Sequence, residues 1–228
     1  MKKEVRLLQL PITRYAEVWT LQHEIFNKLL EGKEADTLIL CEHYPVYTLG
    51  RVTDEANILF SDEQLKKIGA EKFSIERGGD VTFHGPGQIV GYPLLNLSHF
   101  KEDLGWYLRS LEEVIIKTLA TYDIEAFRIP GRTGVWVGST GNEEKICAIG
   151  IKASRWCTMH GFAFNVNTDL SYFNYIVPCG IGDRNVTSLS KLLGRAVELD
   201  ELKERLSEAF EEIFDIALIS KATQIVSR

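Results

Sequence analysis

The stretch from Ile75 to Leu97, which reads IERGGDVTFHGPGQIVGYPLLNL, constrains the fold more than any other part of the chain. It places four glycines between Gly78 and Gly87 and has apolar runs on both sides. Glycine lacks a Cβ and adopts positive φ at little cost, so this density predicts a tight main-chain surface that another backbone or a ligand can approach closely.

The same stretch has the pattern of two short strands. Residues 81–84 alternate between apolar and polar side chains, residues 85–87 (Gly-Pro-Gly) break the pattern, and residues 88–93 form a second apolar run. We therefore expect a β-hairpin with glycine-rich ends. The glycines serve either the turns and bulges of an ordinary hairpin or the approach of a ligand, and composition leaves both interpretations open.

The length and composition favour one domain over residues 1–228. A chain of 228 residues with 45% hydrophobic composition can bury one sizeable core, and no linker rich in proline, serine or charge divides it. No apolar run is long enough for a signal peptide or a membrane span, so we expect a cytoplasmic protein. A formal net charge of −6 argues against nucleic acid as a partner.

The order of predicted elements indicates an α+β fold. Helical periodicity is present over residues 15–30, 61–68, 104–122 and 202–213. Strand-like runs occupy residues 5–10 and 37–41 and the segments VWVG, KICAIGI and GFAFNV. Without regular βαβ alternation, this order predicts a central mixed, largely antiparallel sheet flanked by helices. Residues 15–30 and the aliphatic stripe of 104–122 are assigned to the scaffold, and residues 215–228 are left unassigned.

The cysteines and histidines suggest neither disulfides nor a metal site. The cysteines are irregularly spaced in a chain without an export signal, which favours free thiols. They are Cys41, Cys147, Cys157 and Cys179. Cys157 and His160 have a Cys-x-x-His spacing, but no second ligand pair accompanies them, so we expect no metal. The glycines at 85–91 do not match a nucleotide-binding fingerprint, because a strand pattern follows them where that fingerprint requires a helix.

Three blocks of the sequence resemble the lipoyl(octanoyl) transferases, the octanoyl-[acyl-carrier-protein]:protein N-octanoyltransferases of lipoate synthesis. The blocks are RGGDVTFHGPGQ, then KICAIGIK with HGFAFNVNTDL, and then IVPCGI, and the resemblance spans residues 38–193. It implies the biotin/lipoate protein ligase architecture. It also implies transfer of octanoate from octanoyl-acyl carrier protein to a specific lysine of a lipoyl domain, as the first step of endogenous protein lipoylation, without a cofactor. The implied acceptors are lipoyl domains of 2-oxoacid dehydrogenases or the glycine cleavage H protein.

The resemblance also implies a catalytic Cys/Lys dyad. Cys179, in Pro178-Cys179-Gly180, matches the cysteine that forms the acyl-enzyme thioester, and Lys145 in KxxAIG matches the lysine that faces it. A thiol needs a nearby cation or base to become a nucleophile at neutral pH, and the lysine would supply it. Taken without the resemblance, Lys145 follows a predicted turn and looks like a solvated surface charge. Lys152, seven residues later, is the alternative candidate for this lysine.

Substrate-binding residues are assigned by the same resemblance to three segments. They are Arg77, Gly78, Gly79, Asp80, Val81, Thr82, Phe83 and His84, then Ala148, Ile149 and Gly150, and then Gly161, Phe162 and Ala163. Small or apolar residues suit a saturated acyl chain, in which each buried methylene contributes about 0.8 kcal/mol, so we expect a narrow apolar tunnel. His84 and His160 are interpreted as packed or substrate-orienting residues, and neither is assigned as a general base.

Two other functions fit the same fold. An ATP-dependent lipoate or biotin protein ligase would carry an RRxSGGG-type loop, whereas this chain has ERGGDVTFHGPGQ and a well-placed cysteine that adenylation does not require. A catalytically silent acyl-binding module would need a broken dyad, and both dyad positions are filled. The octanoyltransferase hypothesis is therefore preferred.

Overall fold

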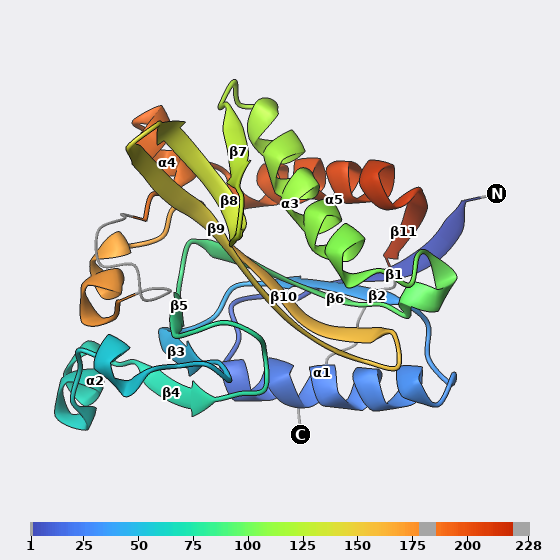
Figure 1. Ribbon diagram of the computed structural model, residues 1–228, viewed down its shortest axis with the longest axis horizontal. Helices are drawn as coiled ribbons and strands as arrows, with labels where there is room; N and C mark the ends of the chain where they lie inside the picture. Colours follow the sequence, from blue (N-terminus) through green and yellow to red (C-terminus); the bar gives the residue numbers. More distant parts are fainter. Residues whose placement is uncertain (1, 178–185, 221–228) are drawn as a thin grey trace.

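The computed structural model describes residues 2–177 and 186–220. Among these residues, eight strands form one mixed sheet in the order β11-β1-β2-β6-β10-β9-β8-β7 (Figure 1). Their bounds are β1 Lys3–Gln9, β2 Thr37–Cys41, β6 Gln88–Leu94, β7 Ala126–Ile129, β8 Arg132–Ser139, β9 Asn142–Ser154, β10 Cys157–Asn165 and β11 Ile216–Ser220. β1 runs parallel to β2 and β11, and the other neighbours are antiparallel. The predicted α+β class with a mixed, largely antiparallel sheet is confirmed.

A small second sheet corrects the prediction of a central hairpin. It has the order β4-β3-β5, from β3 Val46–Leu49, β4 Glu71–Ser74 and β5 Thr82–His84. β5 pairs with β3, whereas β6 pairs with β2 and β10 in the main sheet, so the hairpin prediction is wrong. The turn at residues 85–88, with Gly87 at φ +77°, carries the chain from one sheet to the other. β6 is buried along its whole length, which explains its continuous apolar run.

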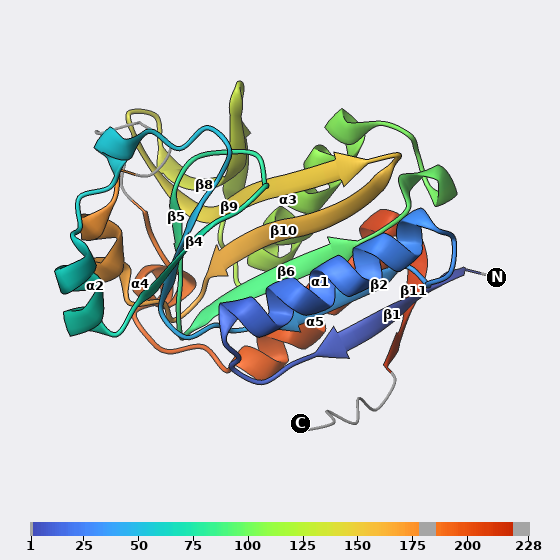
Figure 2. The same ribbon diagram turned by 90° about the horizontal axis from the view of Figure 1, so that it is seen from below.

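Helices cover both faces of the main sheet. α1 Tyr15–Leu30 lies along β6 and β10 on one face, and α3 Leu104–Ala120 and α5 Leu199–Phe214 cover the other (Figures 1 and 2). The predicted bounds of α1 are confirmed. α2 Asp62–Ile68 begins at a capping box formed by Ser61 and Gln64 and ends at left-handed Gly69, as the sequence predicts. The remaining α-helix of the described residues is α4 Leu189–Leu193.

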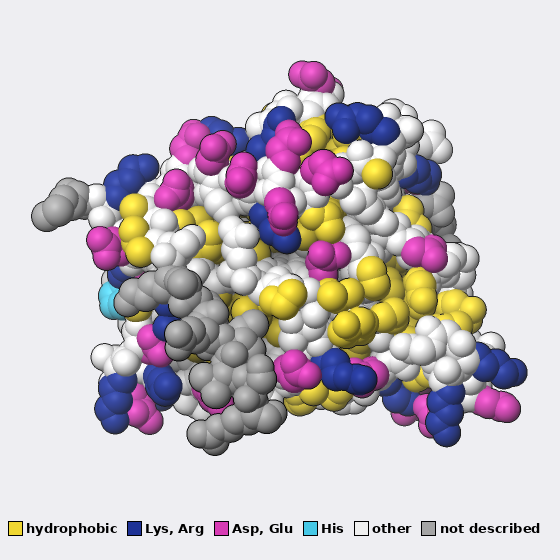
Figure 3. All heavy atoms as spheres, turned by 180° about the vertical axis from the view of Figure 1, so that it is seen from behind, with side chains coloured by type: hydrophobic (Ala, Val, Ile, Leu, Met, Phe, Trp, Pro, Cys, Tyr) yellow, Lys and Arg dark blue, Asp and Glu magenta, His cyan; other side chains and the backbone are white. Residues whose placement is uncertain are grey.

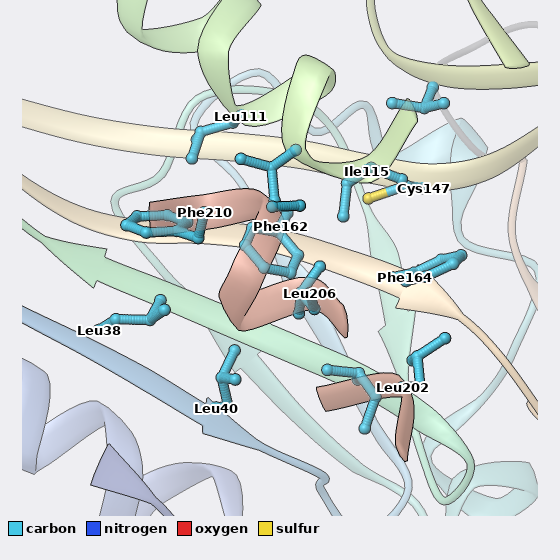
Figure 4. Close-up of a cluster of buried hydrophobic side chains, with 14 of the residues drawn as sticks. Leu38, Leu40, Leu111, Ile115, Cys147, Phe162, Phe164, Leu202, Leu206 and Phe210 are labelled. Carbon is cyan, nitrogen blue, oxygen red and sulfur yellow. The ribbon is translucent and has the colours of Figure 1, made fainter. Parts of the chain in front are cut away.

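The larger part of the hydrophobic core lies between α3, α5 and the sheet. Side chains from both helices meet those of β2, β9 and β10 there, as Figure 4 shows. Leu111 and Ile115 of α3 and Leu206 and Phe210 of α5 are completely buried, which confirms both predicted stripes at these positions. The outer face of α5 is acidic, and Asp and Glu side chains gather over it in Figure 3. Leu104 departs from the α3 stripe, because it begins the helix at the surface and is exposed.

The segment left unassigned from residue 215 onward contains one more strand. β11 pairs in parallel with β1, with Lys3 opposite Ile216 and Leu7 opposite Ser220. Only Asp215, the left-handed C-cap of α5, separates the run IALIS from the helix, and no glycine or proline marks the boundary, so the sequence pattern resembles a continuation of the helix. Residues 221–228 lie outside the described residues. None of the helices described here is long and apolar enough to cross a membrane.

Candidate functional site

The predicted site residues meet around one pocket of about 550 Å³. Among those that the structure describes, Lys145 and every predicted substrate-binding residue except Phe83 line it. They are Arg77, Gly78, Gly79, Asp80, Val81, Thr82, His84, Ala148, Ile149, Gly150, Gly161, Phe162 and Ala163. The ring of Phe83 lies elsewhere and stacks on Tyr172, with the centroids 4.5 Å apart. Cys179 lies outside the described residues.

The glycine-rich loop at residues 77–80 is tied to the two sheets. Arg77 donates from Nη2 to the carbonyl oxygen of Thr48 at 2.7 Å and to its Oγ1 at 3.1 Å. The Gly78 N–H donates to the carbonyl oxygen of Ile151 on β9 at 2.8 Å. Asp80 accepts from Asn57 Nδ2 at 2.5 Å. The loop is therefore anchored across β9, where it forms one wall of the pocket.

Strands β9 and β10 form another wall of the pocket, and their glycines allow neighbouring backbone to approach closely. Gly150 and Gly161 are paired across the two strands. A Cβ on Gly161 would lie 2.1 Å from the carbonyl oxygen of Gly91 on β6, closer than any side chain tolerates. The close approach of β6 and β10 therefore requires glycine at position 161.

Lys145 is a buried lysine at the N-terminal part of β9. It is 8% exposed, and its Nζ lies 4.7 Å from the centroid of the Trp136 ring, within the range of a cation–π interaction. Its interpretation as a solvated surface charge is wrong, because the neighbouring strand β8 covers it. β8 changes register between Val135 and Trp136, where Gly134 lies against the aliphatic stem of Lys145.

A buried carboxylate of α3 holds this bend of β8. Glu112 is completely buried, and its Oε1 accepts from the Gly134 N–H at 3.0 Å. Its Oε2 accepts from Arg109 Nη1 at 2.6 Å and from Arg128 Nε at 3.1 Å. Gly134 has φ +124°, a conformation that favours glycine. Glu112 thus connects α3, β7 and β8 next to Lys145.

His84 belongs to a buried hydrogen-bond network that determines its tautomer. Gln88 donates from Nε2 to Phe83 O and to Asn165 Oδ1, at 3.0 and 2.9 Å. Its Oε1 is therefore the acceptor for His84 Nδ1–H at 2.8 Å. The remaining Nε2 of His84 carries a lone pair and lies 3.4 Å from Thr48 Oγ1. The ring is neutral in this arrangement.

His43 is held in the same neutral form behind the pocket. Its Nδ1–H donates to the carbonyl oxygen of Thr13 at 2.9 Å, so its Nε2 accepts from the hydroxyl of Tyr92 at 2.7 Å. Tyr92 lines the pocket, and its hydroxyl is turned toward His43. This second network fixes the Tyr92 ring.

Burial lowers the pKa of all three histidines at the site. The pKa of His43 falls to about 4, and those of His84 and His160 fall to about 3, from an ordinary value of 6.5. Below pH 6.5 the unfolded chain binds protons that the folded protein does not. The stability that these three histidines contribute is therefore fully present above pH 6.5 and is lost as the pH falls toward their pKa values in the folded protein.

The lowered pKa values of these histidines predict that the protein loses stability in acid. The free energy of unfolding, measured by denaturant titration at each pH, should fall between pH 6.5 and 4 by up to about 1.4 kcal/mol per pH unit for each histidine. His84→Gln cannot titrate and should have a shallower slope than the wild type. An unchanged slope would show that His84 is protonated in the folded protein.

The three cysteines that the structure describes are poor nucleophiles. Cys41 and Cys147 are completely buried and Cys157 is 2% exposed, and burial raises the pKa of each thiol. The expectation that Cys41 and Cys147 fill the core is confirmed.

Lys152, the alternative to Lys145, does not line the pocket. Its Nζ forms an ion pair with Glu76 Oε1 at 3.0 Å.

Some pocket residues were missed by the sequence analysis. Tyr15, assigned to the scaffold, lines the pocket from the first turn of α1, and Leu108 lines it from the α3 stripe. An aromatic or aliphatic residue on the buried face of a helix has the same periodicity whether it faces the core or a cavity. Glu112 had a usable signal, because it lies four residues after Leu108 and three before Ile115 and so places an acidic residue on the apolar face of α3.

The pocket is less apolar than the expected tunnel. Its walls include Ile75, Val90 and Ile149, but Tyr15, Tyr92 and the histidines also line it. The polar residues have two sources: the loop at 77–80 and β5 bring Asp80 and His84 to the pocket, and α1, β6 and β10 bring Tyr15, Tyr92 and His160.

Comparison with known proteins agrees with this arrangement. The family model described as the lipoyl protein ligase A/B catalytic domain matches residues 14–211. The octanoyltransferase of Christiangramia forsetii is 47% identical over 231 residues, covering 96% of this chain and 99% of that protein.

Solved structures share the fold at lower identity. A bipartite lipoate protein ligase from Thermoplasma acidophilum superposes with a TM-score of 0.73 at 18% identity, over 97% of this chain and 88% of that chain. Lipoate-protein ligase A bound with ATP superposes with a TM-score of 0.73 at 16% identity, over 98% of this chain and 90% of that chain. These similarities show the biotin/lipoate ligase fold, and with the sequence matches they show that the chain belongs to the octanoyltransferases that carry the lipoyl protein ligase A/B catalytic domain.

Proposed function

We propose that this protein transfers an octanoyl group from octanoyl-acyl carrier protein to a lysine of a lipoyl domain, through a thioester on Cys179. The observation that supports it best is the pocket itself, where Lys145 and three separate motif segments lie around one cavity. The acceptors are lipoyl domains of 2-oxoacid dehydrogenases or the glycine cleavage H protein. Residues 1–228 act as one catalytic domain in this proposal.

In the first step the Cys179 thiolate attacks the carbonyl carbon of the carrier thioester. The carbon–sulfur bond to the carrier breaks, and the departing carrier thiolate takes a proton from the Lys145 ammonium. A cation next to the thiol favours the thiolate, which is the reactive form. The cysteines of the described core are less suited to this role, because burial raises the pKa of each thiol, and for Cys147 burial outweighs the nearby Lys145.

In the second step the acceptor lysine amine attacks the acyl-enzyme carbonyl. The bond to Cys179 breaks, the amide forms, and neutral Lys145 takes a proton from the attacking nitrogen, which restores the thiolate and ammonium pair. The burial of Lys145 suits this role, since a lysine that exchanges a proton benefits from a partly desolvated site.

The alternative is an ATP-dependent ligase, and the structural similarity to a ligase bound with ATP keeps it testable. Lipoyl-domain modification should be measured by intact mass with octanoyl-carrier thioester in the presence and absence of magnesium-ATP. We expect full transfer without ATP, because the thioester is already activated. Modification from free octanoate that requires ATP, with an inert thioester, would support the ligase.

A further inference from the structure

Lys145 has an aromatic neighbour on the next strand. Trp136 on β8 is paired directly with Lys145 on β9. Side chains of a directly opposed pair lie on the same face of a sheet, close enough to interact. Trp136 is 2% exposed and Lys145 is 8% exposed, so water has little access to either side chain. The ammonium of Lys145 therefore lies in a largely dry site that it shares with an indole ring.

A β-bulge on β9 makes this pairing. Val135 is paired with Cys147, whereas the next residue along β8, Trp136, is paired with Lys145. Ile146 is therefore an extra residue between the two pairs. Ile146 and Cys147 both pack into the core between the sheet and the helices, although neighbours in a regular strand point to opposite faces. Regular alternation would place Lys145 in that core with Cys147, and the bulge turns it toward Trp136 instead.

The aliphatic stem of Lys145 passes along β8 before its ammonium reaches the ring. Gly134 borders the stem, since a Cβ at that position would lie 3.5 Å from Cε and 3.7 Å from Cδ of Lys145. Nζ then lies over the face of the Trp136 ring, 4.7 Å from its centroid. β8 thus supports the side chain at two points, the stem beside Gly134 and the ammonium over Trp136.

The face of an indole ring distinguishes an ammonium from a neutral amine. It carries the negative part of the ring quadrupole, so it attracts a cation that lies within about 6 Å of the centroid. The attraction is stronger where water is excluded, and it amounts to roughly a 2- to 30-fold preference for the charged form. The contact with Trp136 therefore favours the ammonium of Lys145 and fixes where that ammonium lies.

We propose that Trp136 is a positioning residue that holds the Lys145 side chain in its charged form at the pocket. The proposal rests on the acyl transfer proposed above, in which this ammonium favours the thiolate of Cys179. Lys145 lines the pocket and Trp136 does not, so the ring acts on the reaction through the lysine. Weakening the negative face of the ring should lower the thiolate fraction and slow formation of the acyl-enzyme.

The two half-reactions should respond differently to such a change. Acyl-enzyme formation uses the ammonium, whereas attack by the acceptor amine needs neutral Lys145 to take a proton. A weaker ring shifts the lysine toward its neutral form, so it should slow the first step without slowing the second. Loss of packing at a buried tryptophan would instead slow both steps, which separates the proposed role from a purely structural one.

The test replaces tryptophan with mono-, di- and trifluorotryptophan, which withdraw charge from the ring face with little change in ring size. Acyl-enzyme formation from octanoyl-carrier thioester, followed by intact mass in a single turnover, should slow with each added fluorine. Aminolysis of the acyl-enzyme should keep its rate. The pH for half-maximal alkylation of Cys179 by iodoacetamide should move upward along the series. Trp136→Leu removes the ring and should slow acyl-enzyme formation by about 2- to 30-fold.

The matched control is the Trp136→Phe protein grown with the same analogues. The chain has four tryptophans, so this variant carries fluorine at Trp19, Trp106 and Trp156, and its rates should not change along the series. A wild-type series without change, or an equal change in both proteins, would overturn the role of Trp136. Alkylation requires no acyl donor. A graded alkylation series in a protein that forms no octanoyl adduct would contradict the proposed function and still support the Trp136 contact.

Discussion

Replacement of Lys145 with alanine should lower the rate of octanoyl transfer by about 10²- to 10⁴-fold while the protein stays folded. The loss is expected because alanine neither favours the thiolate of Cys179 nor moves a proton in either half-reaction. The fold should survive, since alanine fits an extended strand and the Glu112–Gly134 contact remains. Single-turnover rates of acyl-enzyme formation and of aminolysis measure the effect, and a thermal melt checks the fold.

Lys145→Arg separates the two proposed roles of the lysine. Arginine keeps the positive charge but does not deprotonate, so the Cys179 thiolate should still be acylated, with the departing carrier thiolate taking its proton from water, while aminolysis is impaired. Cys179→Ser should abolish both turnover and the octanoyl adduct in intact mass spectra. Transfer at a near normal rate in Cys179→Ser would exclude the thioester, and direct attack by the acceptor amine on the carrier thioester would then be the better account.

Glu112→Ala should lower the free energy of unfolding by about 1–3 kcal/mol, mainly because the buried Gly134 N–H loses its acceptor. The variant leaves Arg109 and Arg128 without their buried partner and leaves the Gly134 N–H without its acceptor. Denaturant titration measures the change. Because the bend of β8 lies against Lys145, the transfer rate should fall as well.

Two variants control this prediction. Glu112→Gln keeps an acceptor for Gly134 and should restore part of the transfer rate. Glu113→Ala removes a half-exposed carboxylate that also pairs with Arg128, so it should cost less than about 1 kcal/mol. If Glu112→Ala were no less stable than Glu113→Ala, the buried carboxylate would not hold this part of the fold.

Much of the fold could be predicted from local patterns. α1 and α2 begin and end at the predicted residues, because helical periodicity and a capping box act within a few neighbours. The pairing of β5 and β6 could not be predicted in this way. Strand pairing depends on partners far along the chain, and β5 finds its partner in β3 rather than in the strand that follows it.

The site could be predicted in part for a similar reason. The motif segments around Arg77, Ala148 and Gly161 were found by resemblance, and the structure places them around one pocket with Lys145. The burial of Lys145 was not predictable from its place after a turn, because the β8 bend that covers it depends on Glu112 of α3. Tyr15 has no local signal that separates a pocket residue from a core residue.

The pairing of β11 with β1 has a consequence for synthesis on the ribosome. β1 is translated before the other strands of the main sheet, and β11, which completes its second edge, is translated after all of them. Until then β1 presents open N–H and C=O groups, the kind of edge that joins neighbouring chains. The nascent chain therefore carries β1 with one unpaired edge until β11 has been made, and chaperones that cover exposed strand edges have their longest access at β1.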